Sequence, residues 1–247
     1  MKKEKLSIVI VGFNEESVIQ HSLESVLHFF RGKKIPYEII FVDDGSTDNT
    51  LSIVKQIYAK EPCLKIISNK RNHGKGYVVK QGILYATGEV IIVTDADLAY
   101  PIEQIESFIK QSKTHPVVVG TRIHPLSLYL VNYTSFRLLF MRHLSSRIFN
   151  FYVKMLFHIN NTDTQCGLKV MRCDVAKFLA SRFQIKGFSY DVELFLIAKK
   201  HHIPIFEMPV QVRQSCLDSK VVVRKQALKM FMEILKIKWN DFKGVYR

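Results

Sequence analysis

Short apolar runs rich in β-branched residues alternate with amphipathic stretches through the first 120 residues, and this alternation limits the fold to one class. The runs are nearly continuous, as is typical of strands buried on both faces of a parallel sheet. They cover Leu6–Val11, Glu38–Val42, Leu64–Ile67, Val90–Thr94 and Val117–Gly120. The stretches between them have apolar residues at helical spacing and cover Ser17–Phe30, Asp48–Lys60, Lys75–Ala86 and Ile102–Lys113. The pattern predicts an α/β fold with a doubly wound, mostly parallel sheet flanked by helices.

The second half of the chain has a different composition. Between Thr121 and His158 there is no acidic residue, whereas basic side chains alternate with bulky aromatic ones. A strand–helix–helix–strand set is expected at Gly167–Arg172, Val175–Arg182, Tyr190–His201 and Pro204–Val212, followed by a basic amphipathic helix at about Val222–Trp239. No internal repeat or linker divides the sequence, so we expect one domain over residues 1–247.

The charge balance favours anionic partners. The chain carries 36 Lys and Arg against 22 Asp and Glu, a formal net charge of +14, and is 47% hydrophobic, as a globular protein is. Nucleic acid, acidic lipid head groups and phosphorylated small molecules all suit such a charge. The four cysteines form no CxxC pair and indicate reduced thiols. With neither a signal peptide nor a run of about 18 apolar residues, we expect a cytoplasmic protein, free or attached to a membrane face.

Carboxylates follow the ends of three predicted strands. Glu15 closes the Gly-Phe-Asn-Glu segment after the first strand, Asp43 and Asp44 end the second, and Asp95 and Asp97 end the fourth. Ligands of open α/β sheets gather at this edge. Acids brought together repel one another unless a cation or hydrogen bonds from a ligand offset the repulsion. The pattern therefore indicates a ligand cleft at the carboxyl edge of the sheet.

Asp95 and Asp97, one residue apart, are the candidate metal ligands. One or two carboxylates plus substrate phosphates are a common site for Mg²⁺ or Mn²⁺, and the metal would neutralise a diphosphate leaving group. Asp43 could instead accept hydrogen bonds from a base or ribose, with Asp44 beside it as a second substrate-binding candidate. Lys75 begins a helix between two glycines and could hold phosphate by its charge and the backbone N–H groups.

Each of these signals also has a simpler interpretation. Asp-Gly-Ser is a turn in most proteins, and Asp44 or Asp48 would then merely cap the second helix. A single Asp-x-Asp is often a solvated loop. The joint position of the acids at successive strand ends favours a site. The sequence has neither GxGxxG after the first strand nor GxxxxGK[ST], which argues against a dinucleotide oxidoreductase and a P-loop enzyme.

Seven short motifs follow one another along the chain. They are Gly-Phe-Asn-Glu (12–15), Asp-Asp-Gly-Ser-Thr-Asp (43–48), Asn-His-Gly-Lys-Gly (72–76), Asp-Ala-Asp-Leu (95–98), Gly-Thr-Arg (120–122), Asp-Thr-Gln-Cys-Gly-Leu-Lys (163–169) and Phe-Ser-Tyr-Asp-Val-Glu (188–193). This ordered set resembles the family 2 inverting glycosyltransferases of GT-A fold. Among them it is most similar to the polyprenyl-phosphate sugar synthases, especially the dolichyl-phosphate glucosyltransferases, and the resemblance runs from about Leu6 to Arg247.

The resemblance implies roles for the matching residues. On the donor side, Glu15 and Asp43 would contact the nucleoside, and Asp95 and Asp97 would hold the metal diphosphate. Lys75 would sit near the donor phosphates, and Lys220 matches a lysine near the same phosphates. On the acceptor side, Arg122, Arg142 and Ser146 match positions near the acceptor phosphate. The chain departs from the family at two positions. Ala99 stands where mannosyl members often have glutamine, and Asp218 replaces the glycine of a Gly-Ser-Lys element.

The implied reaction moves a hexose from a nucleotide sugar, with UDP-glucose favoured and GDP-mannose possible, to a polyprenyl or dolichyl phosphate at the cytoplasmic face of a membrane. Residues 1–120 would then bind the nucleotide sugar, 121–220 would form the acceptor side with basic amphipathic helices, and 221–247 would be the basic C-terminal helix. Two alternatives remain. One is transfer to a soluble or glycan hydroxyl, and the other is a non-catalytic protein that binds nucleotide sugar or lipid phosphate.

The basic, acid-free segment and the C-terminal helix have a physical interpretation of their own. Apolar faces could enter lipid while arginines meet phosphates. Core helices or a homodimer interface would show the same pattern, and the C-terminal helix could simply pack on the domain. Nucleic-acid binding is disfavoured, because acids at the strand ends would repel a phosphate backbone.

A lipid phosphate would also remove the need for a general base, because it is already ionised at neutral pH. Asp163 and Asp191 are the spare carboxylates if a base is required. Their simpler interpretation is that they are buried partners for Lys169, Arg172 or backbone amides.

Overall fold

The computed structural model describes residues 4–130, 136–213 and 223–247, with 136–145 and 223–225 described by their helical backbone alone. Its centre is a seven-stranded sheet of order β3-β2-β1-β4-β7-β5-β8. The strands are β1 (Leu6–Gly12), β2 (Tyr37–Asp43), β3 (Leu64–Ser68), β4 (Val90–Asp95), β5 (Val117–Thr121), β7 (Lys169–Arg172) and β8 (Ile205–Pro209). Within this sheet β7 runs antiparallel to β4 and β5, and the other neighbours pair in parallel. The predicted α/β class and mostly parallel sheet are therefore confirmed.

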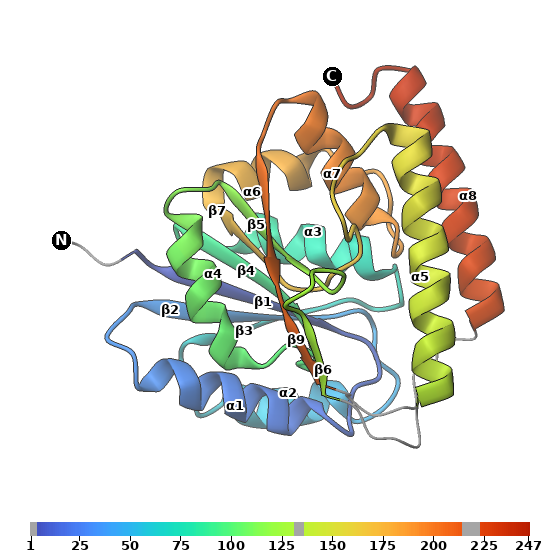
Figure 1. Ribbon diagram of the computed structural model, residues 1–247. Coiled ribbons are helices and arrows are strands. Elements are labelled where there is room, and N and C mark those ends of the chain that lie inside the picture. Colours follow the sequence, from blue (N-terminus) through green and yellow to red (C-terminus); the bar gives the residue numbers. More distant parts are fainter. Residues whose placement is uncertain (1–3, 131–135, 214–222) are drawn as a thin grey trace.

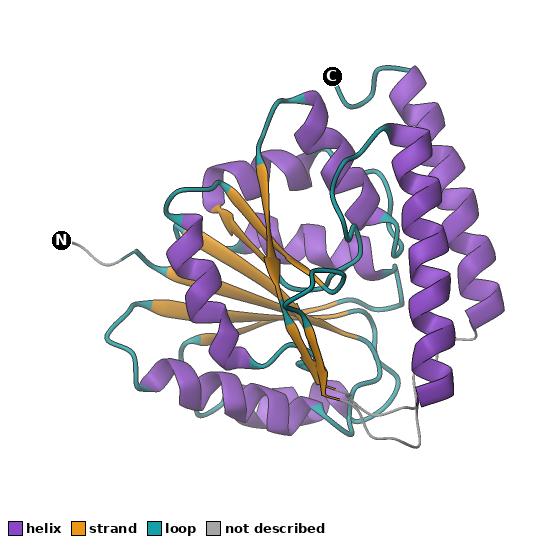
Figure 2. Ribbon diagram, viewed as in Figure 1, coloured by secondary structure: helices purple, strands orange, loops and turns teal. Residues whose placement is uncertain are grey.

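Helices cover both faces of the sheet (Figures 1 and 2). On one face pack α1 (Ile19–Arg31), α2 (Thr50–Tyr58) and α4 (Ile105–Ser112), the last preceded by the 3-10 turn η1 (Ile102–Gln104). On the other pack α3 (Lys75–Tyr85), α6 (Cys173–Ser181) and α7 (Tyr190–Lys200). Two long helices, α5 (Phe136–Phe157) and α8 (Val223–Phe242), lie side by side at one end of the molecule. In the part of the chain that the structure describes, no helix is long and apolar enough to cross a membrane.

Three features of the fold that the sequence did not predict, namely β6, β9 and the direction of β7, depend on contacts with distant parts of the chain. The expected strand at Pro204–Val212 divides into β8 and β9 (Gln211–Arg213), and β9 pairs with β6 (Leu128–Leu130) in a second, two-stranded sheet. All three residues of β6 are exposed, so they show no alternation of burial to detect. The direction of β7 depends on where the chain re-enters the sheet, which local sequence does not record.

A buried carboxylate joins the amino-terminal ends of three strands. Glu38 of β2 is 2% exposed and accepts hydrogen bonds from the Ser7 hydroxyl (2.6 Å), the Thr87 N–H (2.7 Å) and hydroxyl (2.8 Å), and the Nζ atoms of Lys65 (2.7 Å) and Lys5 (3.2 Å). Burial alone would raise the pKa of Glu38, but the hydrogen bonds from Lys65, Ser7 and Thr87 hold it well below its ordinary value. Glu38 therefore stabilises the fold in its ionised form.

We expect Glu38→Gln to lower the free energy of unfolding at neutral pH by about 2 to 3 kcal/mol, because a charged acceptor with several donors is lost. A depressed pKa stabilises the fold above the pKa of the unfolded chain, roughly 4.3, and this stabilisation is lost as pH falls toward the folded value. The difference between the two proteins in urea titrations should therefore shrink below about pH 4. Glu103→Gln, at a carboxylate that is 64% exposed, is the control and should change little. A constant difference at all pH values would contradict this account.

Candidate functional site

The register of three strands brings the predicted carboxylates to one edge of the sheet. Gly12, the last residue of β1, pairs with Asp43 of β2, and Val11 pairs with Asp95 of β4. The loops that follow these strands therefore begin side by side. This is the carboxyl edge at which the sequence predicted a cleft.

Lys75 and Asp95 meet at this edge. Lys75 is the first residue of α3, and its Nζ lies 2.7 Å from Oδ1 of Asp95. Burial alone would lower the pKa of Lys75, but the negative charges of Asp95, Asp191 and Asp97 outweigh burial and raise it. Lys75 therefore keeps its positive charge among three carboxylates, as a group that binds phosphate must.

The backbone before Lys75 requires glycine. Gly74 has a φ of 104°, and a β-carbon there would lie 2.5 Å from the Lys186 carbonyl oxygen. The Gly76 N–H donates to the Gly187 carbonyl (3.1 Å), and the Tyr77 N–H donates to the Lys186 carbonyl (3.1 Å). The start of α3 is therefore held against residues 186–187, which lie more than a hundred residues later in the sequence.

Asp97 lies in a tight turn. The Ala99 N–H donates to its Oδ1 (3.1 Å), and Leu98 between them has a φ of 44°, a left-handed conformation that costs energy for a branched residue. Strain of this kind is often found at functional sites. On the other side of Asp95, a β-carbon at Gly167 would clash with Oδ2, so this position also requires glycine.

The donor set suits a hard cation. Asp95 and Asp97 offer carboxylate oxygens from one turn, and the glycine backbone at position 167 leaves Oδ2 of Asp95 uncovered by a side chain. Among the described residues no group of three or more His, Cys, Asp or Glu is arranged to hold a metal. A cation here would therefore combine these two carboxylates with oxygens of a ligand, and Lys75 would share Asp95 with it.

The two acids at the end of β2, Asp43 and Asp44, are both buried, but they accept hydrogen bonds from different segments. Asp44 is 3% exposed, and its two oxygens accept the N–H groups of His73 (2.8 Å) and Gly74 (2.7 Å). Asp44 thus holds the loop that carries Lys75. Asp43 accepts the Ser68 hydroxyl (3.1 Å) and the Ser46 N–H (3.2 Å) at the sheet edge.

The N-cap residue of α2 is Asn49, so neither Asp44 nor Asp48 occupies that position, although Asp48 bonds the first residue of the helix. Oδ1 of Asp48 accepts the Thr50 N–H (3.0 Å) and hydroxyl (2.6 Å) at the start of α2. The Thr50 hydroxyl in turn accepts the Glu15 N–H (2.7 Å). Glu15 is therefore fixed through its backbone to Thr50, the first residue of α2.

Arg122 forms a bidentate ion pair. Its Nε and Nη2 donate to Oδ2 (2.7 Å) and Oδ1 (2.9 Å) of Asp163, whose side chain is fully buried. Burial opposes both charges, but the mutual hydrogen bonds prevail, so the pKa of Asp163 is lowered and that of Arg122 is raised. Asp163 also accepts the backbone N–H groups of Arg122 (3.1 Å) and Gln165 (3.0 Å), as its simpler interpretation as a partner of backbone amides predicted, while its cation is Arg122 and not Lys169 or Arg172.

Asp191 is the buried partner of Lys169. Its Oδ1 lies 2.7 Å from the Lys169 Nζ, and the two side chains are 6% and 1% exposed. Lys169 also donates to the Cys166 carbonyl (2.6 Å). The simpler interpretation of Asp191 is therefore confirmed.

The structure describes less of three other predicted site residues. Ser146 lies on α5 and is half-buried, and the backbone of Arg142 lies one turn earlier on the same helix. The Arg142 side chain and all of Lys220 fall outside the described residues.

Glu233 of α8 was not predicted as a site residue. Its Oε2 accepts the Ser189 N–H (3.1 Å), and a β-carbon at Gly187 would clash with its carboxylate. Phe188, between these two, lies under Lys75, whose Nζ is 5.8 Å from the ring centroid. Gly187, directly before the Phe-Ser-Tyr motif, was the only sequence signal that the Glu233 carboxylate packs closely against this backbone.

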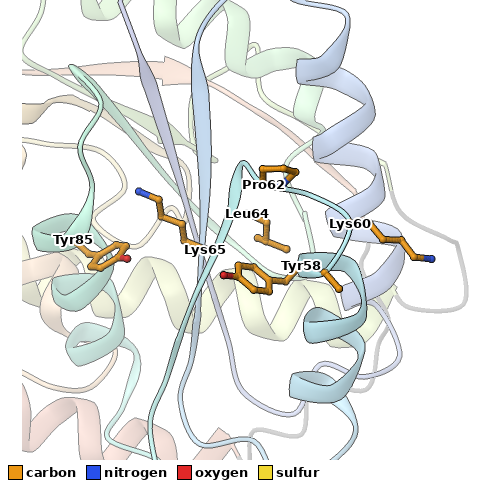
Figure 3. Close-up of a pocket in the computed structure, with 7 residues that line it drawn as sticks. Tyr58, Lys60, Pro62, Leu64, Lys65 and Tyr85 are labelled. Atoms are coloured by element: carbon orange, nitrogen blue, oxygen red, sulfur yellow. The ribbon is translucent and has the colours of Figure 1, made fainter.

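A separate hollow lies away from this edge of the sheet. It has a volume of about 570 Å³ and is lined by residues of α2, β3, α3 and their loops, including Tyr58, Lys60, Pro62, Lys65 and Tyr85 (Figure 3). The Lys65 ammonium is 5.4 Å from the Tyr85 ring centroid and is already paired with Glu38. None of the predicted site residues lines this hollow, so it is not the candidate site.

Known proteins resemble the chain in both sequence and structure. The family description "Glycosyl transferase family 2" matches residues 7–179. The dolichyl-phosphate beta-glucosyltransferase of Dictyostelium discoideum is 29% identical over 98% of this chain and 76% of its own length, and that of Homo sapiens is 30% identical over 99% and 78%.

Solved structures share the fold. A glucosyl-3-phosphoglycerate synthase from Mycobacterium tuberculosis, in complex with Mn²⁺, UDP-glucose and phosphoglyceric acid, has a TM-score of 0.68 at 16% identity over 95% of this chain and 80% of that one. A mannosyltransferase from Pyrobaculum calidifontis, in complex with GDP-Man and Mn²⁺, has a TM-score of 0.60 at 17% identity over 94% of this chain. The chain spans 63% of the length of that mannosyltransferase.

The Lys169–Asp191 pair allows a quantitative test. Asp191→Asn should lower the free energy of unfolding by about 3 kcal/mol, because it leaves a buried ammonium without its counter-ion. Adding Lys169→Met should recover part of this loss, and urea titrations of both single variants and the double variant measure the coupling. The exposed pair Arg172–Asp174, at 2.9 Å with side chains 54% and 64% exposed, is the control and should show little coupling. Additive effects at Lys169 and Asp191 would contradict the pairing.

Proposed function

Because the chain belongs to glycosyltransferase family 2, we propose that it transfers a hexose from a nucleotide sugar to a polyprenyl or dolichyl phosphate. UDP-glucose is the favoured donor and GDP-mannose the alternative. One structural observation carries the proposal: a charged lysine and two carboxylates, Lys75, Asp95 and Asp97, converge at the carboxyl edge of the sheet. The similarity to dolichyl-phosphate beta-glucosyltransferases over nearly the whole chain supports the acceptor.

The donor would bind along the ends of β1, β2 and β4. Asp43 and Glu15 would contact the nucleoside, and Asp44 supports the loop before Lys75. Lys75 would contact the diphosphate, and Asp95 and Asp97 would hold Mg²⁺ or Mn²⁺ against it. A bound metal would neutralise the charge that develops on the diphosphate as it leaves. Lys75 adds a second positive charge at the same place.

The acceptor phosphate would meet Arg122, Arg142 and Ser146, with Lys220 on the donor side. Asp163 engages the Nε and Nη2 edge of the Arg122 guanidinium, so the Nη1 edge is the one that can face a phosphate. The buried carboxylate thus orients Arg122 before the acceptor binds. Such preorganisation reduces the ordering cost of binding.

The chemistry requires no protein base. An ionised phosphate oxygen of the acceptor attacks the anomeric carbon, the bond from that carbon to the diphosphate breaks, and the nucleoside diphosphate leaves with the electron pair. The configuration at the anomeric carbon inverts. Asp163 and Asp191, the two carboxylates considered as bases, are each engaged by a cation, which supports direct attack by the phosphate. The protein's contribution is then positioning and electrostatic stabilisation.

A polyprenyl-phosphate acceptor resides in a membrane. We therefore propose that the protein works at a membrane surface as a peripheral enzyme, on the cytoplasmic face.

A transfer assay tests the proposed function. Purified protein with Mg²⁺ or Mn²⁺ is given a panel of radiolabelled nucleotide sugars and polyprenyl phosphate in detergent. We expect label in the organic phase, highest with UDP-glucose, and none when EDTA removes the metal. Label that appears only on an added soluble acceptor, such as a phosphorylated small molecule or a glycan, would overturn the lipid acceptor. Donor binding without transfer to either kind of acceptor would overturn the enzymatic function.

Asp97→Asn tests the metal ligands. We expect transfer to fall by at least about 100-fold, because charge stabilisation of the leaving group is lost, while the thermal midpoint changes little. Mn²⁺ binding, followed by electron paramagnetic resonance in the presence of UDP, should weaken in parallel. Asp174→Asn, at an exposed carboxylate of α6, is the control and should match the unmodified protein. Unchanged Mn²⁺ binding by the Asp97 variant would remove Asp97 from the metal site.

A further inference from the structure

The apolar side of α8 faces away from the protein. Its buried side consists mainly of Ile234 and Ile237, which are fully buried. The opposite side carries large apolar residues spaced three or four positions apart, and these are between 42% and 82% exposed: Leu228, Phe231, Met232, Leu235, Trp239 and Phe242. A helix packed on a soluble domain normally shows the reverse arrangement. Contiguous exposed apolar surface of this kind marks an interaction site.

The neighbouring helix α5 extends this surface. Ile148, Phe151 and Met155 lie three or four positions apart and are each 63% to 65% exposed. Tyr152 of α5 stacks on Phe231 of α8 with ring centroids 5.9 Å apart. The two helices run side by side along their lengths (Figure 1). Their outward residues therefore form one two-helix apolar surface.

Charge is divided between the two sides of α8. Lys229 and Lys236 of α8, and Lys243 directly after its last residue, recur every seven residues along one border of the apolar stripe, and all three are exposed. The acidic residues of the helix point inward, where Glu233 accepts the Ser189 N–H and Asp241 lies 2.6 Å from the Lys200 Nζ. The outward side is thus apolar and basic, without an acidic side chain among the described residues of the helix.

We propose that this two-helix surface of α5 and α8 docks on an anionic bilayer. The apolar stripe would lie among the upper acyl chains, and the lysines would meet acidic head groups, each contributing about 1 kcal/mol near the membrane surface. The charge pattern selects a bilayer over a second copy of the chain, because two copies joined through this surface would bring their lysines together. The proposal deepens the proposed function by naming the surface that meets the membrane, and its test needs no sugar transfer.

Trp239 gives a direct readout, because it is the only tryptophan of the chain and is 56% exposed within the stripe. The protein is mixed with vesicles of phosphatidylcholine, alone or with phosphatidylserine, in the absence of polyprenyl phosphate. With the anionic vesicles we expect the emission of Trp239 to shift to shorter wavelength and to be quenched by lipids labelled in the upper acyl chain. Raising the salt concentration should weaken the binding.

Flotation of the same mixtures provides the variant test. Replacing Phe231 and Phe242 with serine should reduce binding to anionic vesicles by roughly tenfold or more. Leu84→Ser with Tyr85→Ser removes two comparably exposed apolar side chains from α3 and should leave binding unchanged. Unshifted emission without flotation would overturn the proposal. An emission shift that follows protein concentration without lipid would also overturn it, in favour of self-association.

A separate set of contacts connects α8 to Lys75. Glu233 holds the 187–189 backbone, the Gly187 carbonyl accepts the Gly76 N–H, and the Lys186 carbonyl accepts the Tyr77 N–H. These amides belong to the first turn of α3, which begins with Lys75. We infer that Glu233 is a positioning residue, which acts on the donor site through this loop.

Hydrogen exchange tests this positioning role without any ligand. Glu233→Gln weakens a charge-assisted hydrogen bond, and we expect faster exchange at the Gly76 and Tyr77 amides. Affinity for UDP-glucose with Mn²⁺ should fall by roughly threefold to tenfold, while vesicle binding is unchanged. Asp241→Asn, which removes the other acid of α8, is the control and should alter neither exchange nor affinity at the donor site. Unchanged exchange in the Glu233 variant would overturn the inference, whereas altered exchange in a protein that does not bind UDP-glucose would contradict only the proposed donor.

Discussion

The site depends on the parallel register of β1 with β2 and β4. Every residue of β1 is buried, so a shift of one position would move its apolar side chains to the wrong faces of the sheet, and the register is strongly specified. That register sets Gly12 opposite Asp43 and Val11 opposite Asp95. Residues that are distant in sequence therefore emerge at one edge because of apolar packing along the whole strand, before any polar contact between them forms.

A basic protein holds these acids together by pairing them. In each pair the cation and the carboxylate come from different segments of the chain, and at least one side chain is mostly buried: Lys75 with Asp95, Arg122 with Asp163, and Lys169 with Asp191. In two of these pairs the carboxylate is almost completely covered, whereas the Arg122 side chain stays 26% exposed. The side chains of Lys75 and Asp95 remain 19% and 29% exposed, which leaves that pair accessible to a ligand at the sheet edge. Under the proposed function, this pair would exchange partners when the diphosphate and the cation bind.

Much of the fold and the family could be predicted from the sequence, for identifiable reasons. Continuous apolar strands, and the carboxylates that follow them, carry their signal locally, so β1, β2 and β4 and the acids at their ends were predicted, and the family assignment is confirmed. The antiparallel direction of β7 and the short exposed β6 depend on partners far away in the sequence. The positioning role inferred for Glu233 could not be predicted either, because its partner Ser189 is distant in the sequence. In the sequence alone, a glutamate in a basic amphipathic helix resembles any solvated acid. The roles of the site residues toward donor and acceptor remain predictions that the geometry supports.

The two sides of α8 have different environments. Its inward side uses Ile234 and Ile237 for packing and Glu233 for the loop beside Lys75, while its outward side presents aromatic and aliphatic residues with lysines along the border. An enzyme whose acceptor lies in a membrane must fix the distance between the bilayer and the diphosphate of its donor. A single rigid helix that contacts the membrane with one side and the donor loop with the other sets that distance by its own diameter, roughly 10 Å. The proposed membrane contact would thus account for the exposed apolar side of α8.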